Sequence, residues 1–556
     1  MRAGSVANLV AVLLAIGLAC SQPVDASDIL LLDEDGFGEY GALTDLVVSP
    51  DGHFLYAADG YRGSLSCYAR SAGGRLTEAF EIFPTNGIPF GTGVEELMIS
   101  PDGAHLYAVT YNSGLIIAYA RDSGTGALTQ LQRLDASAVL GYAQGIAISP
   151  DGAHLYVASH SQHTLAVFAR DASSGLLSFV EAEVNGQGGV QGLEEPIGVA
   201  VTPDGTGVYA VSYTQTGGVV AFQRDPATGR LTFVESHVST IFADLRFTFA
   251  VAVSPDSANV YVTRSLGGVV YRRDPLTNAL TRIQDINGTV DHDIWITADG
   301  SRAYGCSGAS VIGGFARDPA TGMLTRDEVY TGSAPEFLPP GFCFGMTISP
   351  DGRSIYTIDS YEDPKTDGYI YALASFRRAN LTCAPAPRTD CRETLHPGAS
   401  VLSLRKGIGS DQRLKWVWNG EATRRAAFGN PVDGNADYVL CLYEAGVPIV
   451  HAAAPGTVSC GKDRPCWVSR GASGVAFNDS ARRFGTQSMA LHATSDGRAR
   501  LVVRGAGPHL DLAQRSFTGS ITAQLQASVG KHSPCWTATY TAPRENSIVI
   551  YRATSD

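Results

Sequence analysis

Short apolar runs bounded by one kind of turn recur along the first two thirds of the chain. Ile146 to Ile148 form such a run, the residues Ser149, Pro150, Asp151 and Gly152 follow it, and a second run covers Leu155 to Ala158. A strand-length run, a Pro-Asp-Gly turn and another run indicate a tight β-hairpin. The Ser or Thr of this motif stands at positions 49, 100, 149, 202, 254, 297 and 349. The period of about 50 residues lies in the range of propeller blades, so seven copies predict seven blades.

Each copy continues with a third and a fourth strand joined by a second recurrent turn. In the fourth and sixth copies this turn is Arg-Asp-Pro-Ala-Thr-Gly, at 224–229 and 317–322, and in the fifth copy Asn278 takes the place of the glycine. Glycine and asparagine adopt a left-handed backbone most easily, so we expect that conformation at this position. Four antiparallel strands per unit, repeated seven times, predict a seven-bladed β-propeller, an all-β fold.

The two ends of the repeat region are each incomplete. The seventh copy has three strands before a Cys- and Pro-rich stretch, and residues 29–32 form an apolar run with no strands of their own ahead of them. A ring leaves no unpaired edge when one terminus completes the blade begun by the other. We therefore expect residues 29–32 to form the outer strand of the seventh blade.

Charge and length indicate a second domain. The chain has 556 residues and a net charge of -13, but residues 1–380 hold 21 Lys and Arg against 41 Asp and Glu, whereas residues 381–556 hold 20 against 13. Apolar or alternating runs of strand length in the second part favour a smaller β-sandwich. We expect an export signal at 1–26, the propeller at 28–380, a linker at 381–397 and a sandwich-like domain at 398–556.

The amino terminus has the features of an export signal. A charged start is followed by an apolar stretch, residues 10–19, that is too short to span a membrane, and small residues at 24–26 suit cleavage. Gly17 to Cys20 resembles a bacterial lipobox, so a lipid anchor at Cys20 is an alternative to free secretion. We expect a secreted or cell-envelope protein, in the periplasm or on the outer surface, with no membrane span.

Ten cysteines in an exported chain predict disulfides. Cys67 falls at a buried apolar position of the repeat and is expected to be a free, buried thiol. Cys306 and Cys343 stand in adjacent blades and could join them. If Cys383 pairs with Cys391, then Cys441, Cys460, Cys466 and Cys535 allow three pairings, which remain open. The cysteine spacings and the lack of a histidine cluster disfavour a metal site.

Candidate site residues gather on one face of the predicted ring. The two recurrent turns share a face of uniform sequence, whereas the opposite face carries connections that vary, such as 83–93, 185–195 and 331–341. Variable loops on a fixed scaffold commonly carry specificity, although they also vary where nothing constrains them. By register the polar residues of this face are Asp45, Arg62, Glu95, Glu96, Gln144, His160, His163, Glu194, Glu195, Tyr213, Arg246, Arg264, His292 and Asp293.

The repeats resemble those of a known family. Tyr261, Val262 and Thr263 followed by Arg264, together with the seven motif copies, resemble the YVTN-repeat propellers of the lactonase and 6-phosphogluconolactonase-like family. The resemblance covers residues 29–378, and Ser257 and Ala298 depart from the motif. Similar repeats also occur in surface propellers without known activity. Relatives in the lactonase group often have a histidine before a blade motif, and His292 resembles that placement. No family is recognised in the C-terminal domain.

Two functions follow as hypotheses. The first is a lactonase that opens a lactone or small cyclic ester, with His292 as general base, Arg246 or Arg264 as oxyanion partner, Glu96 orienting the histidine, and Glu95, His160, His163, Glu195 and Tyr213 binding substrate. This scheme needs no metal or cofactor. The alternative is a binding protein whose loops hold a protein or an envelope glycan while the basic C-terminal domain docks on an anionic polymer. We expect a monomer without a nucleic-acid partner.

Overall fold

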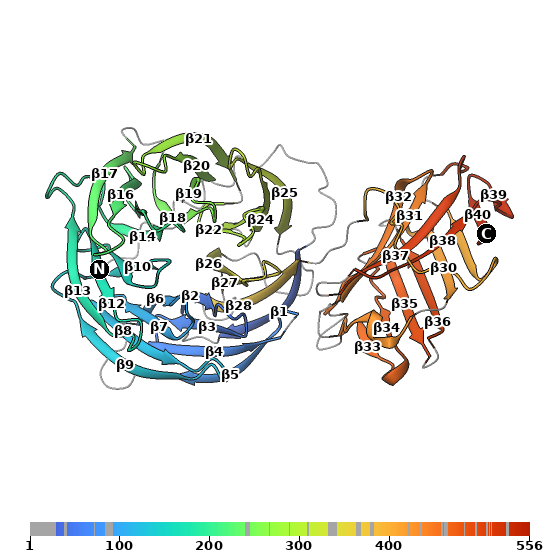
Figure 1. The fold of residues 1–556 in the computed structure, drawn as a ribbon, viewed down its shortest axis with the longest axis horizontal. Helices are drawn as coiled ribbons and strands as arrows, with labels where there is room; N and C mark the ends of the chain where they lie inside the picture. Colours follow the sequence, from blue (N-terminus) through green and yellow to red (C-terminus); the bar gives the residue numbers. More distant parts are fainter. Residues whose placement is uncertain are drawn as a thin grey trace.

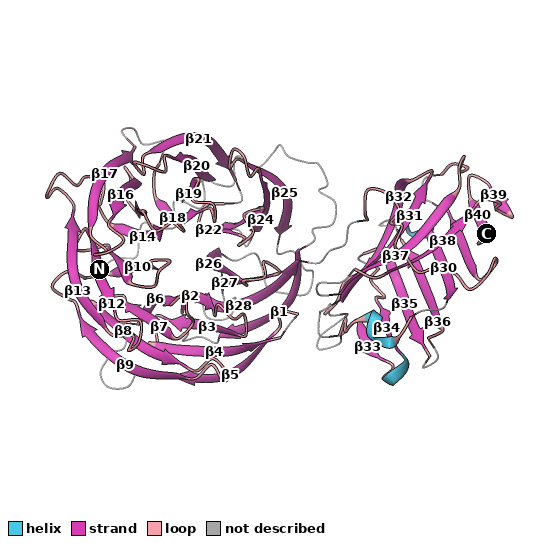
Figure 2. Ribbon diagram, viewed as in Figure 1, coloured by secondary structure: helices cyan, strands magenta, loops and turns pink. Residues whose placement is uncertain are grey.

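The computed structural model describes residues 29–378 and 383–556. Stretches outside the description are 38–41, 72, 84–92, 240–244, 266, 289, 308–310, 332–341, 363–368, 408, 421–422, 433–435, 458–459, 461–464, 483, 495–496, 508–509, 511, 513 and 530–532. The expected signal at 1–26 and the expected anchor at Cys20 therefore lie outside the described residues. Figure 2 shows that almost all of the regular secondary structure in both domains is strand, with loops and turns between the strands. Among the described residues no helix is long or apolar enough to cross a bilayer.

Seven four-stranded antiparallel sheets are arranged in a ring (Figure 1). Six of them are built from consecutive strands. In chain order these blades are β2 (Leu43–Val48), β3 (Phe54–Asp59), β4 (Ser64–Arg70) and β5 (Leu76–Ile82); β6 (Val94–Ile99), β7 (His105–Thr110), β8 (Leu115–Arg121) and β9 (Leu128–Asp135); β10 (Ala143–Ile148), β11 (His154–Ser159), β12 (Thr164–Arg170) and β13 (Leu177–Val184); β14 (Pro196–Val201), β15 (Gly207–Ser212), β16 (Gly218–Arg224) and β17 (Leu231–Val238); β18 (Thr248–Val253), β19 (Asn259–Arg264), β20 (Gly267–Arg273) and β21 (Leu280–Asn287); and β22 (Asp293–Ile296), β23 (Arg302–Ser307), β24 (Val311–Arg317) and β25 (Leu324–Thr331).

The seventh blade joins the two ends of the ring. It consists of β26 (Phe342–Ile348), β27 (Ser354–Glu362), β28 (Tyr369–Arg378) and, as outer strand, β1 (Ile29–Phe37). β1 runs antiparallel to β28, with Ile29 opposite Arg378 and Phe37 opposite Tyr371. The predicted closure of the ring by residues near the amino terminus is therefore confirmed, and the strand extends beyond the expected 29–32. No edge of this blade's β28 is left unpaired.

The blades pack against one another through apolar side chains. Between the third and fourth blades, for example, Tyr156 and Val167 share one buried cluster with Val208 and Phe222. Second strands are buried along their whole length in β11 and β15, and along all but one end residue in β19 and β23. This explains why the second and third runs of each copy are continuously apolar rather than alternating.

A polar clasp repeats between neighbouring blades at the two recurrent turns. Arg170 of the third blade donates to Gly152 O of its own first turn (2.9 Å) and to Asp102 of the second blade (2.8 Å). It also donates to the hydroxyl of Tyr107, which in turn donates to Gly175 O. Five other arginines make corresponding contacts: Arg70, Arg121, Arg224, Arg273 and Arg317. Both turns thus lie on one face, as expected, and their charged residues hold the ring together.

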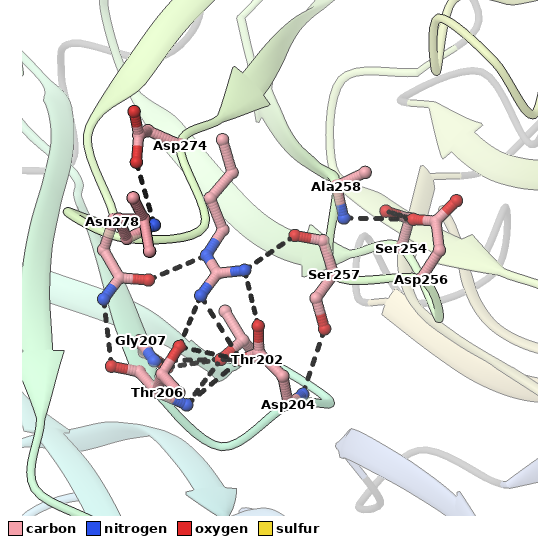
Figure 3. A network of polar contacts seen from close by, with 12 residues as sticks. Thr202, Asp204, Thr206, Gly207, Ser254, Asp256, Ser257, Ala258, Asp274 and Asn278 are labelled. Atoms are coloured by element: carbon pink, nitrogen blue, oxygen red, sulfur yellow. Dashed lines mark hydrogen bonds and ion pairs between the residues drawn. The ribbon is translucent and has the colours of Figure 1, made fainter.

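The fifth blade carries a variation of this clasp (Figure 3). Asn278 has φ 63°, which confirms the expected left-handed conformation, and its Oδ1 accepts from Arg273 Nε at 2.7 Å. In the third and fourth copies a glycine stands there and packs on a ring, as Gly229 does on His154, and in the sixth copy Gly322 packs on the amide of Asn259. Opposite Asn278 the ring is missing, because Gly207 occupies that position. The space that a strand side chain fills in the other copies is filled here by the side chain of Asn278, from the turn between β20 and β21.

The C-terminal domain is a β-sandwich, as predicted. One sheet has eight strands in the order β33 (Trp467–Ser469), β34 (Gly474–Asn478), β35 (Thr486–Ala493), β36 (Ala499–Ala506), β30 (Arg413–Gly420), β29 (Ser400–Arg405), β40 (Ile550–Thr554) and β39 (Glu545–Asn546). The other consists of β32 (Val447–Ala454), β31 (Ala436–Glu444), β37 (Ile521–Val529) and β38 (Cys535–Tyr540). Three short 3₁₀ helices, η1 (Gly409–Asp411), η2 (Arg425–Phe428) and η3 (Gly471–Ser473), connect strands. Trp416, Trp418, Trp467 and Trp536 fill the core between the sheets.

The disulfides confirm one prediction and correct another. Cys306 bonds Cys343, as expected, and Cys67 is free and buried. The pairing of Cys383 with Cys391 is wrong, because Cys383 bonds Cys441 and Cys391 bonds Cys535, which leaves Cys460 with Cys466. The physical reason is the course of the segment between the first two cysteines. It crosses the four-stranded sheet, with Arg388 bonded to Gln524, so its two ends reach different strands.

Candidate functional site at the propeller mouth

Four carboxyl groups from the innermost strands lie close enough to influence one another's charge. They are Asp45 on β2, Glu95 and Glu96 on β6, and Asp293 on β22. Burial raises the pKa of Asp45 to about 8 and that of Glu95 to about 7. Burial, followed by the charge of Asp45, raises the pKa of Glu96, and burial also raises the pKa of Asp293. Part of this group is therefore neutral at pH 7.

Three of these acids also join neighbouring blades. Asp45 Oδ2 accepts from Leu97 N–H at 2.7 Å, and Asp293 Oδ2 accepts from Met346 N–H at 2.9 Å. Glu96 makes a similar contact, because its carboxyl group accepts a hydrogen bond from the backbone N–H of Ile146 on β10, but its other buried oxygen, Oε2, accepts none from any described residue. A buried oxygen without a partner favours the protonated form. All three acids thus link their first strand to the next blade, and Glu96 keeps one carboxyl oxygen that no described residue bonds.

An arc of side chains beside this cluster runs across the second, third and fourth blades. Glu95 Oε1 lies 3.5 Å from Gln144 Nε2, and Tyr111 stacks on Tyr142 with ring centroids 4.7 Å apart. Tyr142 in turn lies 6.2 Å from the ring of His160. His160 Nε2 is 3.6 Å from Glu195 Oε2. We call Tyr111, Tyr142, His160 and Glu195 the first arc.

A second arc continues through the fourth, fifth and sixth blades. Tyr213 contacts Phe247 and Phe249, with centroids 5.1 and 5.2 Å away. Phe249 stacks on His292 at 4.6 Å, and His292 Nδ1 lies 2.9 Å from Asp291 Oδ1. The guanidinium of Arg246 lies 5.9 Å from the Phe247 ring. We call Tyr213, Phe247, Phe249 and His292 the second arc. It extends from His292 to Phe247, which lies beside Arg246.

The structure separates some residues that the sequence grouped together. The orienting contact expected from Glu96 to His292 is made by Asp291, while Glu96 lies among the carboxyl groups. Arg264 pairs with Asp285 on β21 at 2.9 Å, and Arg62 lies 4.0 Å from Asp59. His163 has φ 53° in a turn and accepts from Glu195 N–H through Nδ1 at 3.0 Å, so it shapes the loop before β14.

Sequence reasoning named Tyr213, His160 and His292 but missed the other aromatic members of the two arcs, which are Tyr111, Tyr142, Phe247 and Phe249. Tyr111, His160 and Tyr213 each directly follow a second strand, and Phe247 precedes a first strand. An alignment of the copies by these two positions would have shown the aromatic character of the rim. Of the variable loops, 185–195 is described, whereas 84–92 and 332–341 lie outside the described residues. In the described part of the chain, three potential metal ligands come together at Asp390, Cys391 and Cys535, where both sulfurs already form a disulfide.

Comparison with known proteins agrees with the repeat analysis. Residues 25–140 and 140–241 match the family model of the lactonase seven-bladed β-propeller. Among solved structures, a candidate 6-phosphogluconolactonase of Bacteroides uniformis is similar at 18% identity and a TM-score of 0.45, over 52% of this chain and 85% of that one. The periplasmic gluconolactonase of Pseudomonas aeruginosa is similar at 19% and 0.44, over 52% and 85%. Hydrazine synthase of Kuenenia stuttgartiensis is similar at 18% and 0.43, over 60% and 96%.

No curated protein matches the chain in sequence. The C-terminal sandwich lies outside the family match, which ends at residue 241. The resemblance predicted from the repeats is thus confirmed, and the propeller is similar to the lactonase seven-bladed β-propeller family.

Proposed function

We propose that this chain is an exported hydrolase that opens a lactone or another small cyclic ester at the mouth of its propeller. One observation carries the proposal. The pair of His292 and Asp291 lies on Phe249, beside the buried Asp293, and so combines a base, an orienting carboxylate and an aromatic surface at one rim. The four disulfides suit an oxidising compartment outside the cytoplasm.

His292 would act as the general base. If its Nδ1–H donates to Asp291, Nε2 is the basic nitrogen, and it can take a proton from water as that water attacks the carbonyl carbon. The carbonyl oxygen gains negative charge in this step. The C–O bond of the ring then breaks, and the proton passes from His292 to the ring oxygen. The products are an alcohol and a carboxylic acid, and the acid releases its remaining proton to the solvent to become a carboxylate.

The positive group near the developing oxyanion is Arg246 in this proposal. It reaches the second arc through Phe247, whereas Arg264, the other arginine of the site, is held by Asp285. Glu95 and Glu96 can contribute in a different way. Carboxyl groups with raised pKa values stay partly protonated at neutral pH and can donate a hydrogen bond to a substrate oxygen.

The two arcs suit a ring-shaped substrate. Tyr213 and Phe249 offer faces to the apolar side of a ring, and Glu195 and His160 offer acceptors and donors for hydroxyl groups. His163 would affect substrate binding indirectly, because it accepts a hydrogen bond from the backbone of Glu195 and so positions the loop before β14. The test is a pH-stat assay of the purified chain over sugar and aliphatic lactones, with and without chelator. We expect turnover of at least one lactone; rates equal to buffer across the panel would remove the proposal for those substrates.

Binding without turnover is the second candidate, and a specific observation favours it. Tyr142 and Tyr213 are 38% and 37% exposed, although large aromatic side chains are usually buried. Exposed rings at the rim suit a partner such as an envelope glycan. Equilibrium binding of a glycan that the protein does not hydrolyse, lost when loop 185–195 is exchanged, would support this function over the first.

A further inference from the structure

The outer face of the eight-stranded sheet in the C-terminal domain is positively charged. The strands of this sheet contain the cations Arg405, Arg413, Lys415, Arg500, Arg504 and Arg552, and all six are exposed. The same strands contain one carboxylate, Glu545. Trp416, Trp418 and Leu501 alternate with these cations and point into the core, so the cations are on the outer side.

Strand register sets the cations in a row. Arg504 on β36 lies directly opposite Lys415 on β30. Lys415 is opposite Ser403 on β29, and Ser403 is opposite Arg552 on β40. Neighbouring strands are about 4.8 Å apart, so these charges are spaced at roughly 5 and 10 Å. Arg504, Lys415 and Arg552 form the basic row, and Arg413 stands opposite Arg405 beside it.

Little within the described residues balances this charge. Glu545 lies 3.3 Å from Arg552, and both side chains are largely exposed. Arg405, Lys415, Arg500 and Arg504 form no ion pair with a described carboxylate. Like charges directly opposite in a sheet are destabilising, as for Arg504 with Lys415 and Arg413 with Arg405. An external polyanion would relieve this repulsion.

The other outward residues of this face indicate which class of polyanion it would bind. Next to the basic row, Val502 on β36 is opposite Val417 on β30, which is opposite Val401 on β29. These side chains are aliphatic. Among the described residues, the outward positions of this sheet hold no Phe, Tyr or Trp on which bases could stack, and the ring that they do hold is the imidazole of His492, opposite Arg500. Arginine suits planar carboxylates through two parallel hydrogen bonds. Charges in a line suit a linear polymer better than a single small anion.

We propose that the outer face of the eight-stranded sheet binds a linear acidic polysaccharide, whose carboxylates pair with Arg504, Lys415 and Arg552. Figure 1 shows β30, β36 and β40 on the side of the C-terminal domain away from the propeller, so a polymer bound there leaves the mouth accessible. The polysaccharide tethers the protein, and the proposal does not depend on hydrolysis at the mouth.

Binding of the full chain to polygalacturonate, measured by calorimetry at several salt concentrations, tests this inference. We expect affinity that falls as salt rises, because bound counterions are released, and no binding to neutral dextran. The double variant Arg504→Glu with Lys415→Glu is expected to bind about tenfold more weakly. A control with the same change in net charge, Arg133→Glu with Arg272→Glu, alters exposed arginines of the propeller and is expected to bind like wild type.

Three results would overturn the proposal. They are the absence of binding to polygalacturonate, an equal loss in both double variants, and tighter binding of single-stranded DNA or of anionic lipid vesicles than of the polyuronate at the same salt. Circular dichroism of each variant shows whether the sandwich is still folded. If the charge-reversed pair does not fold, Arg504→Gln with Lys415→Gln replaces it and is expected to show a smaller loss in the same direction.

Discussion

Arg224 of the fourth blade and Asp151 of the third form an ion pair across the blade boundary, with 3.0 Å between Nη2 and Oδ2. Arg224 is buried, and it also donates to the hydroxyl of Tyr156 and to Gly205 O. The two residues come from the two turns that define the repeat. The conspicuous repeated residues of the two turns therefore stabilise the assembly of the ring. A catalytic or binding site is expected on the opposite face.

Replacing Arg224 should weaken the propeller. Arg224→Met removes the contacts of a buried guanidinium with Asp151, Tyr156, Gly205 and His154, and we expect the free energy of unfolding to fall by about 2–4 kcal/mol. Arg230→Met is the matched control, because Arg230 is exposed and pairs with Glu181 at the surface, where a pair contributes about 1 kcal/mol or less. Urea unfolding of both variants measures the difference, and equal midpoints would contradict the clasp.

Because the side chain of Asn278 fills the space above Gly207, we expect the effects of substitutions at these two positions on stability to be strongly coupled. Asn278→Gly alone loses the hydrogen bonds of the Asn278 side chain to Arg273 and Gln223. Gly207→His alone creates a steric clash, because a Cβ at position 207 would lie 2.4 Å from Asn278 Oδ1. The double variant recreates the pair seen at His154 and Gly229. We expect each single variant to destabilise by about 1–3 kcal/mol and the double to recover at least about 1 kcal/mol. Additive losses in thermal unfolding would refute this view.

Ring closure by β1 can be tested by truncation. Deleting residues 28–35 exposes the edge of β28, which pairs with β1 along most of its length. We expect the melting temperature of the propeller to fall by several degrees and the variant to aggregate more readily. Differential scanning calorimetry beside the full chain checks this, with the transition of the C-terminal domain as internal reference. An unchanged propeller transition would mean that β1 does not stabilise the ring.

The carboxyl groups at the mouth predict a pH dependence of stability. A carboxyl whose pKa is raised in the folded state stabilises the fold below its unfolded pKa, and this contribution is lost as pH rises through the folded pKa. For Asp45 the window runs from 3.8 to about 8. We expect wild type to lose stability across it, and Asp45→Asn to lose about 1–3 kcal/mol less between pH 5 and pH 9. If the free energy of unfolding changed with pH in the same way for wild type and for Asp45→Asn, the raised pKa of Asp45 would be contradicted.

The repeat pattern predicted the blades, the closing strand and the conformation of Asn278, because each depends on local sequence and on a period that can be counted. The inter-blade role of Arg224 was not predictable in this way, since Tyr156 and Asp151 lie 68 and 73 residues before it, which does not match the period of the repeat. The pairing of Cys383 with Cys441 depends on how one segment crosses a sheet, which cysteine spacing does not encode.

The arrangement of the candidate residues could be predicted from the sequence only in part. Register put Glu95, Glu96, His160, Tyr213 and His292 on one face, and the structure does bring carboxyl groups and two aromatic arcs together there. Register did not reveal which residue contacts which, because those contacts join loops of neighbouring blades. Asp291 rather than Glu96 therefore contacts His292, and Arg264 turns to Asp285.

The most direct test of the account is the rate of lactone hydrolysis by His292→Ala beside His53→Ala. His53 is an exposed histidine on the first turn, next to Asp51 and on the uniform face, so its loss should not affect the mouth. For any lactone that wild type hydrolyses, the account predicts about 10²–10⁴-fold slower turnover by His292→Ala and an unchanged rate for His53→Ala. Equal rates for wild type and His292→Ala would contradict the proposed site.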